Sequence, residues 1–70
     1  MDTSLREPFV EEFAAVYAEV RDALDERQRR LLLGAAARRV GRGGIKRVAA
    51  VVGVDPETVS RGVKQVAAGP

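Results

Sequence analysis

Apolar residues recur at steps of three and four along almost the whole chain, and this spacing limits the fold to amphipathic helices that pack on one another. In residues 8–24 the positions with this spacing are Phe9, Phe13, Val16, Tyr17, Val20 and Leu24. Such a stripe buries one side of a helix and leaves the other side in water. The same spacing returns in residues 25–41, 45–52 and 55–66, so the chain is predicted to be all-α with four helices.

Three positions suit the starts of these helices. Asp25 is followed three residues later by Gln28, which is the spacing of a capping box at the start of the second helix. Asp55 precedes Pro56, and an aspartate cap with proline in the first turn predicts the start of the fourth helix. Pro8 suits the first turn of the first helix, because its missing N–H would have no partner there.

Glycines are placed to end the helices. Gly41 is expected to end the second helix, and Gly53 is expected to close the third in the left-handed conformation that glycine adopts without strain. Gly43 and Gly44 complete a glycine-rich linker over residues 41–44, and so many glycines would destabilise the interior of a helix. We expect both to form a tight turn.

The second, third and fourth predicted helices bury mainly aliphatic side chains. These are Leu31, Leu32, Ala35, Ala36 and Val40 in the second helix, Ile45, Val48, Ala49 and Val52 in the third, and Val59, Val63 and Val66 in the fourth. In the first helix, the aromatic residues Phe9, Phe13 and Tyr17 are expected in the core, although Tyr17 could also face a partner subunit.

The spacing within residues 45–66 matches the packing needs of a helix-turn-helix. Ala49 lies four residues before Gly53, where two closely crossing helices need a small side chain.

The chain length of 70 residues predicts one small domain. An acidic N-terminal helix (1–24) lies beside a tri-helical, homeodomain-like core, which consists of a support helix (25–41) and a C-terminal helix-turn-helix (45–66). Order is expected to fade in residues 67–70.

Charge is divided sharply along the chain. Residues 1–26 hold eight acidic and two basic residues, whereas residues 27–70 hold ten basic and two acidic residues. The net charges of these parts are −6 and +8, although the whole chain carries only +2. Such asymmetry points to a polyanionic partner for the basic part, and double-stranded DNA is the predicted partner.

Several function classes are disfavoured by composition. The chain has no cysteine and no histidine, which argues against disulfides, imidazole catalysis and the usual zinc sites. We expect no enzyme activity, no catalytic residues, no metal, no cofactor and no small-molecule substrate. No apolar run approaches the roughly 20 residues of a membrane span, and the acidic N-terminus is unlike a signal peptide. A cytoplasmic, nucleoid-associated protein is therefore expected.

Two resemblances favour the same interpretation. The pattern VAxxxGVxxxTVSR at residues 48–61 resembles the headpiece of lac-repressor-type regulators, where this run is a DNA-binding helix-turn-helix. A longer match comprises LDERQRRLL at 24–32, AAAR at 35–38, GxGGIxxVAxxxGV at 41–54 and TVxRGV at 58–63. It resembles the N-terminal helix-turn-helix region of bacterial insertion-sequence transposases of the Rhodopirellula-type DDE family.

The transposase resemblance spans residues 24–66 and implies DNA binding. In that family a nuclease domain of ribonuclease-H-like fold follows, and nothing in this chain matches it. The resemblance therefore implies either a transposase-derived DNA-binding domain or a small stand-alone regulator of transcription. One departure is Asp55, which stands where the family has a capping serine and brings a negative charge toward the phosphates.

The candidate DNA contacts on the fourth helix are the residues outside its valine stripe: Glu57, Thr58, Ser60, Arg61, Lys64 and Gln65. The resemblance implies that Glu57, Thr58 and Arg61 face the groove. Arg61 can form two bonds to guanine and Gln65 two to adenine, while Thr58 and Ser60 suit phosphate. Three further cations near the start of the third helix are candidates for phosphate contacts: Arg42, Lys46 and Arg47.

The remaining basic residues of the second helix are expected to have a structural role and no role in DNA binding. Four arginines of the second helix are expected to be solvated or to complement its dipole: Arg29, Arg30, Arg38 and Arg39. The competing function is a protein-interaction or dimerisation module, in which the acidic N-terminal helix forms a homodimer or binds a basic partner.

Overall fold

The computed structural model describes residues 6–69, with side chains described from Phe9 onward. Helix α1 spans Arg6–Val20 and is followed by a short 3-10 helix, η2, at Arg21–Ala23. Helix α2 spans Glu26–Val40, α3 spans Gly44–Val52 and α4 spans Pro56–Ala68. Within the described range all regular structure is helical, so the predicted all-α class with four α-helices is confirmed.

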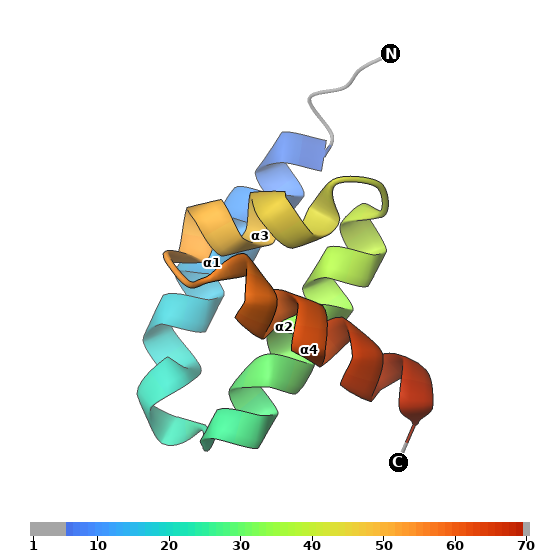
Figure 1. The fold of residues 1–70 in the computed structure, drawn as a ribbon. Helices are drawn as coiled ribbons and strands as arrows, with labels where there is room; N and C mark the ends of the chain where they lie inside the picture. Colours follow the sequence, from blue (N-terminus) through green and yellow to red (C-terminus); the bar gives the residue numbers. More distant parts are fainter. Residues whose placement is uncertain (1–5, 70) are drawn as a thin grey trace.

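Helix α2 lies at the centre of the fold. It packs mainly against α4 and α3, while α1 packs chiefly against α3. Figure 1 shows the chain reversing at η2 so that α2 runs back beside α1, with α3 crossing over α1 and α4 crossing over α2. The last three helices thus form a tri-helical unit, and α1 is attached to it largely through α3.

The core is built around Leu33, Val48 and Val59, whose side chains are almost completely buried. Tyr17 and three small residues complete it: Ala36, Ala37 and Ala49. Among the described residues no polar or charged side chain is buried besides the hydroxyl-bearing Tyr17. Since Tyr17 is only 3% exposed, it belongs to the core and does not face a partner subunit.

Helices α2 and α4 cross where two glycines meet. A Cβ atom on Gly34 would overlap the backbone carbonyl group of Gly62, and a Cβ atom on Gly62 would overlap the carbonyl oxygen of Arg30. No side chain separates the two backbones at this point, so the helices approach more closely than alanine would allow. This crossing sets how α4 sits on the central helix.

The expected turn role holds for Gly43 and Gly44, since the N–H of Gly44 donates to the carbonyl oxygen of Gly41 at 2.8 Å and closes the turn. Gly43 precedes α3 with a φ of 77°. Gly44 is the first residue of α3 and is buried, and a Cβ atom there would overlap the carbonyl oxygen of Ala37 in α2. Gly44 therefore closes the turn and also allows the start of α3 to pack closely on α2.

The predicted caps of α2 and α4 are confirmed. The backbone N–H of Gln28 donates to Asp25 Oδ1 at 2.8 Å, and the N–H of Asp25 donates to Gln28 Oε1 at 2.9 Å, which completes the capping box. At α4, Asp55 Oδ1 accepts from the N–H of Glu57 at 2.8 Å, with proline in the first turn.

The predicted stripe of the first helix is wrong at its C-terminal end. The α-helix stops at Val20, and Leu24 lies beyond η2 in an extended conformation. Val16 and Val20 are exposed, whereas Val10, which lies outside the predicted stripe, is buried. The reason is tertiary: α1 packs mainly onto α3 with the side that carries Val10 and Tyr17, so Val16, about a quarter turn away from Tyr17, stays exposed.

The predicted buried side of the second helix is also shifted. Leu33, Gly34, Ala36 and Ala37 are the buried residues, while Ala35 is exposed and Leu31, Leu32 and Val40 are half-buried. Because α3 and α4 both pack on α2, the buried side faces them rather than following the first leucine pair. At the other end of the chain, α4 continues to Ala68, so the helix extends into the expected tail; Pro70 lies outside the described residues.

Candidate nucleic-acid interface

Helices α3 and α4 are joined by the short turn that the spacing predicts. Gly53 has a φ of 78° and a ψ of 37°, the left-handed conformation that favours glycine. Its N–H and that of Val54 both donate to the carbonyl oxygen of Ala49, at 2.9 and 3.0 Å. The side chain of Ala49 is 2% exposed, so a larger side chain would not fit there.

The outward face of α4 carries Glu57, Arg61 and Lys64, which are all exposed. They recur at steps of four and three residues and therefore lie on one side of the helix. Arg61 Nε lies 3.9 Å from Glu57 Oε2, with the two side chains 68% and 72% exposed. An ion pair this exposed contributes little stability, so it breaks easily when the guanidinium meets another acceptor.

The two edges of that face hold half-buried polar residues. Ser60 lies on the edge toward α3, and Thr58 and Gln65 lie on the edge toward α2. Gln65 Oε1 accepts a hydrogen bond from Arg30 Nε at 2.9 Å. The amide of Gln65 is thus engaged inside the domain, and the expected pairing with adenine would require this bond to break.

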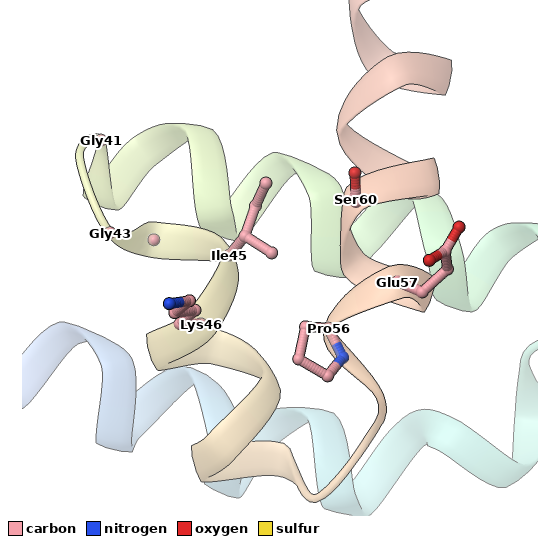
Figure 2. A pocket seen from close by; sticks show the side chains of 8 residues that line it. Gly41, Gly43, Ile45, Lys46, Pro56, Glu57 and Ser60 are labelled. Atoms are coloured by element: carbon pink, nitrogen blue, oxygen red, sulfur yellow. The ribbon is translucent and has the colours of Figure 1, made fainter.

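The first turns of α3 and α4 border one shallow hollow of about 580 Å³. Figure 2 shows Ile45 and Pro56 on its two sides, with Lys46 on α3 and Ser60 on α4 at its margins, while the Glu57 carboxylate points away from α3. Gly43 supplies no side-chain cap to α3. Amide groups in an uncapped first turn are suited to receive an anion.

The three cations predicted to contact phosphate lie within or next to the sequence segment that lines this hollow. Arg42 is exposed in the turn between α2 and α3, and Lys46 is exposed in the first turn of α3. Arg47 is half-buried. The structure therefore brings Lys46 and Ser60 together at one hollow, and the outward face of α4 begins at the same place with Glu57.

Three arginines of α2 make contacts that the expectation of solvated charges missed. Arg29 Nε donates to the carbonyl oxygen of Arg21 at 2.7 Å and so ties α2 to η2. Arg30 joins Gln65 of α4 to Glu26, whose carboxylate lies 3.4 Å away. The Arg39 guanidinium lies 5.9 Å from the centre of the Phe9 ring. The pair of Glu26 and Arg30 has the local i,i+4 spacing of one helix face, but the other contacts could not be predicted locally, because their partners lie 8 to 35 residues away.

The described residues offer no group of three or more acidic, histidine or cysteine side chains that could hold a metal ion. None of the described helices is long and apolar enough to span a bilayer. In comparisons with known proteins, no family model, no curated protein and no solved structure matches this chain. The resemblances at residues 24–66 and 48–61 therefore stay predictions.

Proposed function

We propose that this chain binds double-stranded DNA, with α4 in the major groove and the first turn of α3 on the phosphate backbone. The observation that carries the proposal is the single surface formed by the outward face of α4 and the uncapped start of α3, which meet at one hollow. An α-helix fits the major groove, and the second helix of a helix-turn-helix is the one that enters it.

Charge and shape on this surface favour the proposal. Arg61 and Lys64 project from α4, and Arg42 and Lys46 are exposed at the start of α3, so four exposed cations outnumber the two exposed acidic residues there, Asp55 and Glu57. Phosphate contacts position a protein on DNA and base contacts select the sequence. In this arrangement Arg61 contacts a base edge in the major groove, and the cations at the start of α3 contact the DNA phosphates.

The resemblance at residues 24–66 extends the proposal to a biological role. It favours a transposase-derived DNA-binding domain or a small stand-alone regulator that acts on DNA in the nucleoid. The proposed role is recognition of a DNA sequence, and no chemical step on DNA is assigned to this chain.

The affinity for duplex DNA should fall steeply with salt. If Arg42, Lys46, Arg47 and Lys64 each neutralise one phosphate, the log–log slope of the binding constant against salt is about −3.6. Raising salt from about 50 to 200 mM should then weaken binding about 150-fold. Fluorescence anisotropy with duplexes selected from a random pool measures this slope, and a slope near zero, or no binding at low salt, would overturn the proposal.

Arg61→Ala and Lys46→Ala should weaken DNA binding in different ways. Arg61→Ala removes a base contact and should cost about 1–3 kcal/mol on the preferred sequence, with little change on unrelated duplexes. Lys46→Ala removes a phosphate contact, so it should weaken all duplexes alike and reduce the salt slope by about one. Binding curves on a preferred and a scrambled duplex separate the two effects.

Arg21→Ala is the matched control, because it removes one positive charge from η2, away from α3 and α4. It should change neither the sequence preference nor the salt slope by a comparable amount. If Arg61→Ala and Lys46→Ala behaved identically, the assignment of α4 to the groove would be wrong.

A further inference from the structure

An apolar groove runs along α2, bordered by α1 on one side and by the C-terminal half of α4 on the other. One hollow of about 200 Å³ lies between α1 and α2, and a second of about 410 Å³ lies between α2 and the C-terminal half of α4. The two share Leu32 and Ala35, so they form one surface. We call it the α2 groove, lined by Phe13, Leu24, Leu31, Leu32, Ala35 and Val66.

The charged residues that border the α2 groove are basic. Arg39 lines the hollow next to α1, where its guanidinium lies over the Phe9 ring. Arg27 lines a smaller hollow that continues from Leu31 and Val66. A partner that fits here therefore presents apolar side chains flanked by carboxylates.

The outer surface of α1 has that chemistry. Val16 is 60% exposed and Val20 is 36% exposed, so α1 holds two of the three large apolar side chains left exposed in the described part of the chain. Glu12, Val16 and Val20 are spaced by single helical turns, and Glu19 lies beside them. We call these four residues the α1 ridge.

We propose that the α1 ridge of one copy of this chain seats in the α2 groove of a second copy, and the reverse, in a two-fold symmetric homodimer. Both complementary surfaces are on one chain, and a two-fold symmetric interface uses the same self-complementary patch on both copies. Val16 and Val20 would cover the apolar groove, while Glu12 and Glu19 would approach Arg39 and Arg27. A different protein would have to reproduce this pattern of apolar and acidic residues.

This inference goes beyond DNA binding and does not depend on it. Glu57, Arg61 and Lys64 lie outside the α1 ridge and the α2 groove, so the outward face of α4 stays exposed in the dimer. Such a dimer presents two copies of α4, and a two-fold DNA-binding dimer selects a palindromic site.

Sedimentation equilibrium of the whole chain without DNA tests the dimer directly. The wild-type chain should reach twice its mass of 7.5 kDa as its concentration rises. Val16→Arg should return it to the mass of one chain, because a charge would enter the apolar groove. Val51→Arg, at a valine of α3 that is 43% exposed, is the matched control and should leave the dimer unchanged. Arginine is a good helix former, so thermal melts should show both variants folded.

Charge reversal gives a second, independent test. One variant carries Glu12→Lys and Glu19→Lys, and the other carries Arg27→Glu and Arg39→Glu. Each alone should be monomeric, because like charges then face each other across the interface, whereas an equal mixture of the two should form the dimer again. A wild-type chain that stays at 7.5 kDa up to concentrations on the order of 1 mM would overturn the proposal. So would a dimer unaffected by Val16→Arg, or a mixture that fails to associate. Loss of DNA binding with an intact dimer would count only against the proposed function.

Discussion

Gly62→Ala should destabilise the domain by about 3 kcal/mol, although the same exchange in an ordinary helix interior stabilises by about 1 kcal/mol. A Cβ atom at Gly62 would overlap the carbonyl oxygen of Arg30, and the neighbouring amide of Gly34 is also in contact. Backbone atoms cannot turn aside as a flexible side chain can. The helices α2 and α4 would have to separate, which would loosen the packing around Leu33 and Val59.

Thermal unfolding followed by circular dichroism measures this effect. In a domain of this size each kcal/mol lowers the Tm by about 4–8 °C, so Gly62→Ala should melt about 12–24 °C below the wild type. Gly53→Ala is the matched control, since its Cβ atom would meet nothing within 4 Å and only the left-handed backbone, with a φ of 78°, opposes it. Its cost should be about 1–2 kcal/mol. A Gly62→Ala variant that melts at or above the wild-type temperature would show that the helices do not cross at Gly34 and Gly62.

Leu33→Ala should cost about 2–5 kcal/mol, because Leu33 is 1% exposed at the centre of the core and its loss would leave a cavity between α2 and its neighbours. A domain of 70 residues has a total stability of roughly 4–10 kcal/mol. This single change could therefore remove half of the free energy of unfolding. Denaturant titration gives the difference between the variant and the wild type.

Leu31→Ala is the matched control for that experiment. Leu31 is half-buried, lines the α2 groove and lies outside the core cluster, so its truncation should cost only about 1 kcal/mol. Both variants should be measured at low chain concentration, where association does not add to stability. Equal losses for Leu31→Ala and Leu33→Ala would contradict the observed orientation of α2.

The buried side of α2 could not be predicted from the sequence alone. Leu31, Leu32 and Leu33 follow one another, and each of the three choices gives an acceptable apolar stripe on an isolated helix. Only the joint packing of α3 and α4 selects Leu33, together with Gly34, as the buried side. The wrong prediction for Val16 and Val20 has the same origin, because the packing of α1 on α3 selects the side that carries Val10 and Tyr17 as the buried one.

Part of the candidate interface could be predicted from the sequence, and part could not. The exposure of Glu57, Arg61 and Lys64 follows from the valine stripe of α4, which is a property of the helix itself. The engagement of Gln65 by Arg30 does not, because it joins residues 35 positions apart on different helices.

By itself, the sequence determined the four helices and most of their boundaries. The capping box at Asp25, the cap at Asp55 and the left-handed Gly53 act over two to four residues, and such local interactions are the same in any fold that contains these segments. The tertiary structure alone decided which side of α2 is buried, that Gly34 and Gly62 face each other, and that the α2 groove stays uncovered. These features depend on how helices distant in the chain meet, and contacts of that kind leave no periodic pattern in the residues that make them.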